Sequence, residues 1–212
     1  MKKIITLALT LAALAAGATV TTPAAATTAA IPKGFLLYEK DAAKKDNDPE
    51  TNWKVGNSAK VKLAVNPCDR STLAATGRVA ARTVTFTGVP DFMKVEQVIL
   101  YGSRASAVSA VAQVRAALTR CGARTDSGSS YRYASSRLTG VGDEALRISG
   151  QVYYAGKAGV GGDRSVLVRK GNAVLVYLWA GEYARPAKSD WTVQLRDARK
   201  MTAKICDIAA CG

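Results

Sequence analysis

The sequence predicts an α+β fold: an antiparallel sheet of five to six strands, two main helices packed on one face, and two disulfides. Three observations predict it. Short alternating or apolar segments separated by turn signals recur between residues 82 and 180, as in an antiparallel sheet. The segments 105–120 and 191–206 have the apolar spacing of amphipathic helices. Four cysteines, an even number, suit a disulfide framework.

The first 30 residues are expected to be a secretory signal peptide. Lys2 and Lys3 precede a charge-free apolar run that ends at Ala16, and small residues follow. That run is too short to span a bilayer, and the small residues favour cleavage over an uncleaved anchor. Cleavage is expected after Ala26, with Ala30 as a second option. We therefore expect a secreted chain in which residues 31–212 form a single domain without a transmembrane segment.

The mature chain is expected to begin with a docked polar arm. The lysine-rich segment 31–60 has few apolar residues, so we interpret it as a short helix or extended arm held by residues 35–37 and Trp53. A short helical piece is expected to start at Cys68 and to stop near Gly77. Glycine suits such an end because it adopts the conformations that terminate helices.

The middle of the chain is expected to contain two strands and the first main helix. Residues 82–87 alternate at period two, residues 95–101 form a second strand, and residues 88–91 form the turn between them. Ser103 is a suitable N-cap for the helix at 105–120, and Gly122 suits its end. The apolar stripe of this helix is Val108, Val111, Val114 and Leu118.

The second half is expected to be mostly strands: 131–135, 143–154, 164–169 and 173–180. The polar segment 126–130 is interpreted as a loop, and residues 170–172 as a tight hairpin turn. The glycine-rich segment 156–162 is expected to be a flexible connection, because it lacks the G-x-x-x-x-G-K-[ST] pattern of a phosphate-binding loop. Asp190 is expected to cap the last helix.

The four cysteines allow three disulfide pairings. We favour Cys68–Cys121 with Cys206–Cys211, because only four residues separate the last two cysteines. Cys68 and Cys121 then close a long loop, which the chain-entropy model values at about 4 kcal/mol. The chain has no C-x-x-C motif and no histidine to complete a zinc shell. We therefore expect neither a metal nor a cofactor.

Several classes of catalytic site are disfavoured. A chain without histidine cannot build a Ser-His-Asp or Cys-His arrangement. No S-x-x-K motif selects a serine for a Ser-Lys pair. Paired carboxylates would suffice for glycoside hydrolysis, but Asp143 and Glu144 are adjacent, which on a strand points them to opposite faces. The sequence therefore predicts no enzyme, and a carboxylate-dependent hydrolase remains the catalytic alternative.

The positive net charge predicts an anionic binding partner. The formal net charge is +14, and cleavage would remove two basic residues and no acid, leaving +12. We expect an anionic cell-wall polymer or a small polar ligand as partner, although a basic composition also serves solubility alone. Nucleic acid is not expected, because no recognised binding motif is present. Arginines lie near tyrosines in the second half, and the candidate ligand-binding residues are Arg147, Tyr153, Arg164 and Arg169.

The order of elements resembles exported actinobacterial sensor-type domains, similar to the extracellular domain of a mycobacterial serine/threonine kinase. The resemblance runs from about Phe35 to the C terminus. The segments that carry it are Pro67-Cys68, Glu96-Gln97-Val98 in a strand ending at Tyr101, the Ala-rich helix ending at Cys121, residues 141–145, the hairpin 168–174 and the C-terminal helix.

This resemblance implies an α+β fold with two disulfides, a central cleft for an unidentified ligand, and no catalytic residues. The chain lacks a kinase domain, so direct signalling across a membrane is not implied. We therefore expect a non-catalytic exported binding domain of the bacterial cell envelope. The alternatives are a secreted carboxylate-dependent hydrolase and a secreted protein-interaction module, which would require a flat exposed apolar patch.

Overall fold

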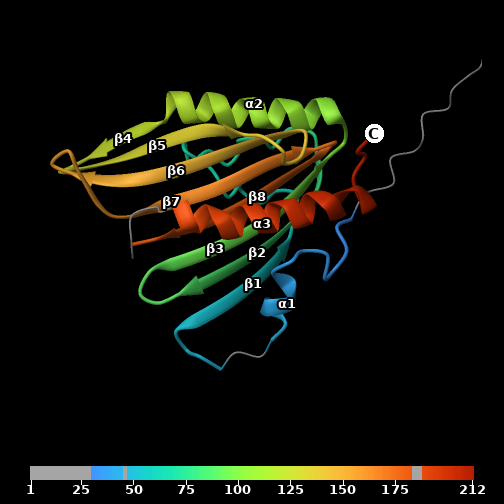
Figure 1. The fold of residues 1–212 in the computed structure, drawn as a ribbon, viewed down its shortest axis with the longest axis horizontal. Helices are drawn as coiled ribbons and strands as arrows, with labels where there is room; N and C mark the ends of the chain where they lie inside the picture. Colours follow the sequence, from blue (N-terminus) through green and yellow to red (C-terminus); the bar gives the residue numbers. More distant parts are fainter. Residues whose placement is uncertain (1–29, 45–46, 183–187) are drawn as a thin grey trace, which may run out of the picture.

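The computed structural model describes residues 30–44, 47–182 and 188–212. The expected signal peptide lies almost wholly outside this part of the chain. One antiparallel sheet of eight strands forms the centre, in the order β1-β2-β3-β8-β7-β6-β5-β4 (Figure 1). The strands are β1 Thr51–Asn57, β2 Arg78–Gly88, β3 Phe92–Tyr101, β4 Ala123–Asp126, β5 Ser129–Leu138, β6 Glu144–Tyr154, β7 Lys157–Lys170 and β8 Ala173–Gly181. The helices are α1 Glu39–Ala42, α2 Arg104–Arg120, α3 Lys188–Lys204 and the 3-10 turn η1 Ile205–Asp207.

The expectation of five to six strands is wrong, because the two edge strands were not recognised. β4 is a four-residue polar segment, and β1 alternates only over its first residues, where Trp53 packs against the core and Val55 is exposed, so both patterns are too short to identify a strand. β4 pairs with β5 through the turn at Ser127 and Gly128, in a segment interpreted as a loop. The glycine-rich segment 156–162 was also misread, since nearly all of it belongs to β7 rather than to a flexible connection.

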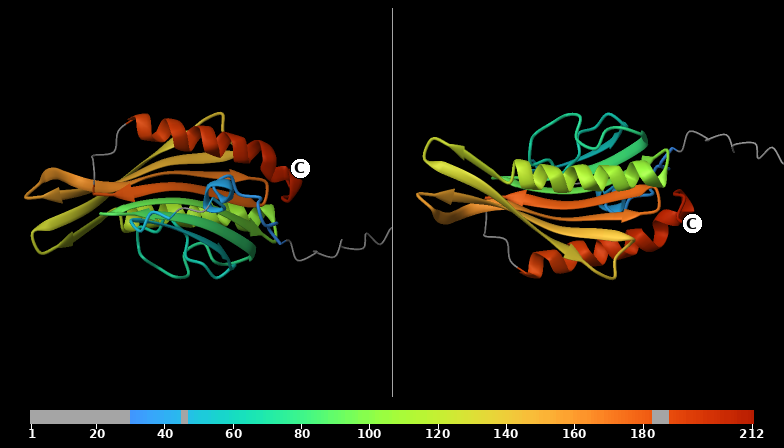
Figure 2. Two further views of the ribbon diagram at one scale, coloured as in Figure 1. Left: turned by 90° about the horizontal axis from the view of Figure 1, so that it is seen from below. Right: turned by 90° about the horizontal axis from the view of Figure 1, so that it is seen from above.

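The two main helices cover opposite faces of the sheet, so the prediction that they share one face is wrong (Figure 2). Val111 of α2 packs in one apolar core with Val176 of β8. Met201 of α3 packs in the other core with Leu175, the neighbour of Val176 on the same strand. β8 is apolar on both sides because both of its faces are covered.

The helix expected at 105–120 is confirmed as α2. Its N-cap is Ser103, whose hydroxyl accepts a hydrogen bond from the backbone N–H of Ser106 at 3.1 Å. The short helical piece expected between Cys68 and Gly77 is absent, since this part of the chain consists of turns. Arg78 holds those turns by donating hydrogen bonds to three backbone carbonyls: Val61, Leu73 and Ala74.

Both favoured disulfides are confirmed: Cys68–Cys121 and Cys206–Cys211. Cys121 is the C-cap of α2, so the first disulfide ties the end of that helix to the turn segment before β2. The second closes the tail that follows η1. No helix in the described ranges is long and apolar enough to cross a membrane.

The N-terminal arm docks on the α3 face through two buried carboxylates. Glu39 accepts bidentate hydrogen bonds from Arg82 at 2.7 and 2.6 Å. Burial acts to raise the pKa of Glu39, but Arg82 and the backbone N–H groups of Gly34 and Leu36 outweigh it and lower the pKa. Glu96 is fully buried and accepts the backbone N–H groups of residues 37 and 38. Burial is the dominant influence there and raises its pKa.

Candidate ligand-binding sites

A small hollow of about 260 Å³ opens on the α3 face near the free edge of β5. The pairing of β5 with β6 sets Ser136 opposite Arg147 and Ala134 opposite Ser149, so these side chains share one face. Trp191, in the first turns of α3, closes the hollow from above. We call it the α3-face hollow; its lining is Ala134, Ser135, Ser136, Arg147, Ser149 and Trp191.

Arg147 is the cationic group of the α3-face hollow. Its guanidinium carbon lies 5.1 Å from the centre of the Trp191 ring, within cation–π range. Its Nε donates to the Ser136 hydroxyl at 3.3 Å, and no described carboxylate forms an ion pair with it. The Trp191 Nε1 is buried without a hydrogen-bond partner among the described residues. The hollow therefore offers a cation, an aromatic side chain and hydroxyls.

Arg164 and Tyr153 share this face but lie outside the hollow. Arg164 stands opposite Ser149 in the sheet, and its guanidinium forms an ion pair with Asp190 of α3. Its charge is therefore already compensated by a neighbour. Tyr153 lies near the far end of β6, where the Arg132 guanidinium carbon is 4.6 Å from its ring centre. Of the four predicted residues, Arg147 alone lines this hollow.

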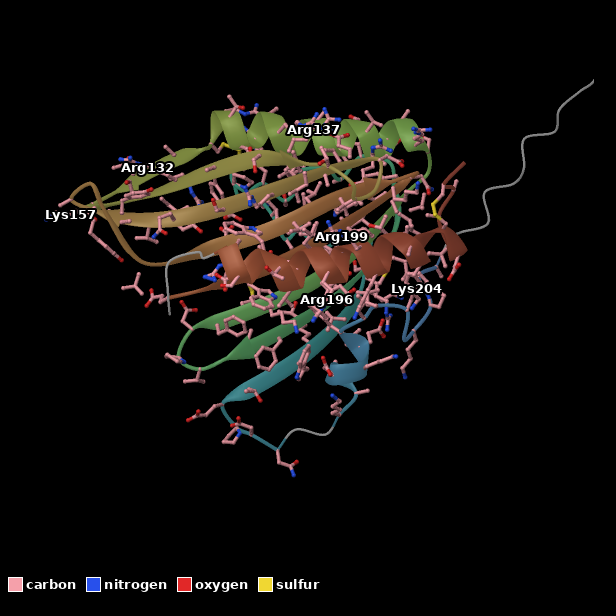
Figure 3. The ribbon with its side chains drawn as sticks, in the orientation of Figure 1. Arg132, Arg137, Lys157, Arg196, Arg199 and Lys204 are labelled. Atoms are coloured by element: carbon pink, nitrogen blue, oxygen red, sulfur yellow. A yellow bond between two sulfur atoms is a disulfide. The ribbon has the colours of Figure 1, made fainter. Side chains whose placement is uncertain are left out.

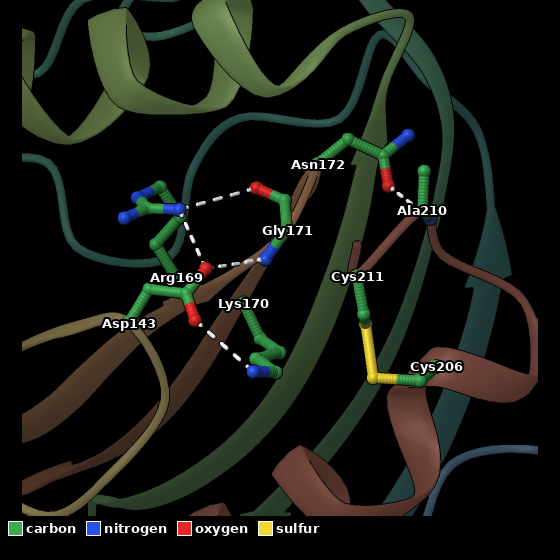
Figure 4. Close-up of a disulfide and its surroundings, with 8 residues drawn as sticks. All are labelled: Asp143, Arg169, Lys170, Gly171, Asn172, Cys206, Ala210 and Cys211. Carbon is green, nitrogen blue, oxygen red and sulfur yellow. Dashed lines mark hydrogen bonds and ion pairs between the residues drawn. A yellow bond between two sulfur atoms is a disulfide. The ribbon is translucent and has the colours of Figure 1, made fainter.

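Arg169 lies on the other face, at the opposite end of β7, in a compact ion-pair cluster (Figure 4). Its Nη1 donates to Asp143 at 2.8 Å, and its Nε lies 3.6 Å from Glu144. Asp143 also accepts the backbone N–H of Gly171 and an N–H of Lys170. The cluster fixes the hairpin between β7 and β8, so this arginine and both carboxylates have structural partners.

The same hairpin holds the C-terminal tail. The Asn172 side-chain oxygen accepts the backbone N–H of Ala210 at 2.8 Å, next to the Cys206–Cys211 disulfide (Figure 4). Gly171 has a φ of +56°, and a Cβ there would lie 2.0 Å from the Ala210 carbonyl oxygen. Glycine is therefore required both by the turn and by the tail packed on it.

Sequence reasoning missed a second site, on the α2 face beyond the end of α2. A hollow of about 450 Å³ there is lined by Met93, Tyr131, Val152 and Ala180, with Asp91 and Glu182 also in its lining. We call it the α2-face hollow. A neighbouring hollow of about 400 Å³ shares Tyr131 and Val152 with the α2-face hollow and is also lined by Arg124 of β4. Tyr131 thus lies at the boundary between the two.

Tyr131 is held by a buried carboxylate. Its hydroxyl donates to Asp163 of β7 at 2.5 Å. Burial raises the pKa of Asp163, and the nearby Tyr131 and Tyr133 hydroxyls only partly offset it. Burial together with the nearby Asp163 charge raises the pKa of Tyr133 to about 12. Tyr131 and Tyr133 are two residues apart, which places both on one face of β5. The sequence could have indicated this, but only the pairing of β6 with β7 shows that Asp163 lies beside them.

The exposed charge of the molecule is predominantly basic. Arg196, Arg199 and Lys204 lie along α3, whereas Arg132 and Lys157 lie near the tips of the hairpins at the far end of the sheet (Figure 3). The described residues contain no group of three or more histidine, cysteine or acidic side chains that could hold a metal ion.

Comparison with known proteins shows a likeness in fold to a solved structure. No family model matches the chain, and no curated protein matches it in sequence. The structure is similar to the extracellular domain of PknH from Mycobacterium tuberculosis, with a TM-score of 0.54 and 12% sequence identity. The match covers 85% of this chain and 100% of that domain. The resemblance to a mycobacterial kinase extracellular domain is therefore confirmed at the level of the fold.

Proposed function

We propose that this chain is a non-catalytic, exported binding domain of the bacterial cell envelope, with an anionic or sugar-containing ligand in the α3-face hollow. The observation that carries the proposal is Arg147: a cation with no ion pair to a described carboxylate, against the Trp191 ring and beside serine hydroxyls. An arginine binds carboxylate or phosphate groups through paired N–H donors, and an aromatic ring packs against the apolar face of a sugar.

The fold and the disulfides support the export part of the proposal. The similar structure is an extracellular domain, and disulfides persist in oxidising compartments outside the cytosol. The hydrolase alternative has less support, because Asp143 and Glu144 are engaged with Arg169 at a structural turn. A carboxylate pair for glycoside hydrolysis requires room for a sugar between the two groups.

The experiment is co-sedimentation of the mature protein with purified bacterial cell walls at low and high salt. We expect binding that persists at high salt, because a specific hollow does not depend on long-range charge attraction. Arg147→Gln and Trp191→Leu should each weaken binding about ten-fold, the loss expected for one charge-assisted contact.

Arg137→Gln is the matched control, since Arg137 is exposed on β5 and pairs with Leu146, whose side chain packs in the core under α2. It removes the same charge without touching the α3-face hollow. Equal losses in Arg147→Gln and Arg137→Gln would mean general charge attraction and would contradict a specific site. No sedimentation at either salt concentration would contradict a wall ligand.

A further inference from the structure

The α2-face hollow has the opposite charge from the rest of the molecule. Among the described residues, the charged side chains in its lining are the carboxylates of Asp91 and Glu182, both exposed. The chain as a whole has 30 basic residues against 16 acidic ones, so two described carboxylates in one hollow stand out from its composition. The α2-face hollow therefore differs in charge from the α3-face hollow, whose charged lining residue is Arg147.

Asp163 adds a third carboxylate beneath the hollow. It lies on β7 opposite Ala180, which lines the hollow, and it is 8% exposed. Its Oδ2 accepts the Tyr131 hydroxyl, but its Oδ1 is buried without a hydrogen-bond partner among the described residues. A buried carboxylate oxygen without a donor is costly, and such a group in a native protein calls for an explanation, such as a bound ion or water or a functional role.

The contact between Tyr131 and Asp163 depends on a glycine. A Cβ on Gly150 would lie 2.3 Å from the Tyr131 hydroxyl oxygen and 2.5 Å from Asp163 Oδ2. Gly150 has no positive φ that would otherwise require glycine. The sheet is thus open at this position so that the tyrosine can lie across the strand and reach the aspartate.

We propose that the α2-face hollow binds an organic ammonium ion. The ammonium group lies against the Tyr131 ring and between the carboxylates of Asp91 and Glu182. The alkyl part lies on Met93, Val152 and Ala180. An aromatic face and carboxylates together are the groups that recognise alkylated ammonium ions. The negative charge of Asp163 lies behind the tyrosine and adds to the attraction. Arg124, which lines the neighbouring hollow, has its guanidinium carbon 5.7 Å from the centre of the same ring, so the proposed ligand takes the side of the ring that faces Asp91 and Glu182.

The test uses choline as the probe and dimethylbutanol, its uncharged carbon isostere, as the matched compound. The full mature protein is titrated with each at fixed ionic strength, and backbone amide chemical shifts are followed by NMR. We expect choline to shift the amides of Val152, Gly161, Gly162 and Ala180 in a saturable manner. Dimethylbutanol should leave them nearly unchanged, because it matches the shape of choline and lacks the charge.

Variants locate the site. Tyr131→Leu should weaken choline binding about five-fold or more, the loss expected for a cation–π contact. Tyr153→Leu is the matched control on the other face and should bind choline as the wild type does. Because Tyr131→Leu affects a partly buried side chain, the exposed pair Asp91→Asn with Glu182→Gln provides a second measurement, with an expected loss of about three-fold.

Three outcomes would overturn the proposal. The first is equal shifts with choline and dimethylbutanol, which would mean apolar binding without charge recognition. The second is wild-type affinity in the Asp91→Asn, Glu182→Gln double variant. The third is choline shifts scattered over exposed acids elsewhere. Arg147→Gln should leave choline binding unchanged, so the result is independent of the wall-binding experiment.

Discussion

The two faces of the sheet use neighbouring residues for opposite purposes. Asp163 and Arg164 are adjacent on β7, and their side chains point to opposite faces. Asp163 is buried against Tyr131, and one of its oxygens has no donor among the described residues, whereas Arg164 forms an ion pair with Asp190. One strand therefore supports two chemically unlike surfaces, because the alternation of its side chains separates charges that are adjacent in the sequence.

The two faces also differ in the disulfides that hold the ends of their helices. The disulfide at the end of α2 joins residues 53 positions apart, whereas the one after α3 joins residues five positions apart. A disulfide that closes a long loop restricts the unfolded chain much more than one that closes a short loop. The α2 face should therefore depend more strongly on its disulfide than the α3 face does.

The largest effect on stability should come from removing the Cys68–Cys121 disulfide. Cys68→Ala with Cys121→Ala is expected to lower the free energy of unfolding by about 4 kcal/mol, and Cys206→Ala with Cys211→Ala by about 2 kcal/mol. Urea denaturation of the two double variants beside the wild type measures both. Equal losses would contradict the loop-length argument and would point to native-state contacts of the disulfides as the main contribution.

The next largest effect should come from the buried ion pair of the α3 face. Arg82→Gln leaves the Glu39 carboxylate buried without its partner, and we expect a loss of about 3 kcal/mol at neutral pH. Because the pKa of Glu39 is lowered in the folded protein, the stability it contributes is present above the ordinary pKa of glutamate. That contribution is lost as the pH falls through the folded-state value.

Lys62→Gln is the control for that experiment. It removes one partner of the exposed pair with Asp69, whose side chains are 58% and 73% accessible. Exposed pairs contribute at most about 1 kcal/mol, so the unfolding curve should hardly move. Similar losses in both variants would show that the arm is not held by the Glu39–Arg82 pair.

The parts of the fold that could be predicted from sequence are those set by local chemistry. The helix at 105–120 was predicted from its Ser103 cap and its apolar spacing, and the structure starts it at Arg104. The hairpin at 170–172 followed from its glycine. The polar strands β1 and β4 could not be predicted in this way, because their partners in the sheet, not their own residues, make them strands.

The apolar composition of β8 also indicates where the helices lie. The run from Val174 to Ala180 has no polar position, which is typical of a strand covered on both faces. Two helices on one face would have left half of that strand exposed to water. A fully apolar central strand therefore predicts one helix on each face, as the structure has it.

The candidate sites were less accessible to sequence reasoning because they depend on register and helix docking. Arg147 could be singled out by its charge, but its neighbour Trp191 lies 44 positions away and arrives only when α3 docks. Arg169 looked equivalent to Arg147 in sequence, yet an odd number of positions from Arg164 carries its side chain to the other face. Asp163 was hidden because the glycines before it suggested a loop.

A smaller effect should come from closing the gap that admits Tyr131. Gly150→Ala places a methyl group against the tyrosine hydroxyl and Asp163, and we expect a loss of about 2 kcal/mol with displacement of Tyr131. Gly56→Ala is the control, since nothing lies within 4 Å of the added atom. Choline binding should weaken in Gly150→Ala, whereas wall binding on the other face should remain. Loss of both would mean that the two faces are not independent.

The smallest effect should come from Asp163, whose contribution to stability depends on pH in the opposite direction from that of Glu39. Burial raises the pKa of Asp163, and its surroundings include Tyr131 and Tyr133 from β5, the backbone of Gly150 from β6, and Arg164 on its own strand. A group with a raised folded-state pKa contributes stability below its ordinary pKa. That contribution is lost as the pH rises through the folded-state value.

Asp163→Asn should therefore stabilise the protein at pH 7 by about 1 kcal/mol, because an amide has no charge to desolvate and still accepts the Tyr131 hydrogen bond. Below the ordinary pKa of aspartate the gain should vanish, since the wild-type carboxyl is then neutral as well. Urea denaturation across that pH range measures the difference. A loss of stability at pH 7 would mean that the ionised carboxylate holds the fold together, and that the α2 face is built like the ion-paired α3 face. A gain, accompanied by weaker choline binding, would mean that this carboxylate is kept for a ligand at the expense of stability.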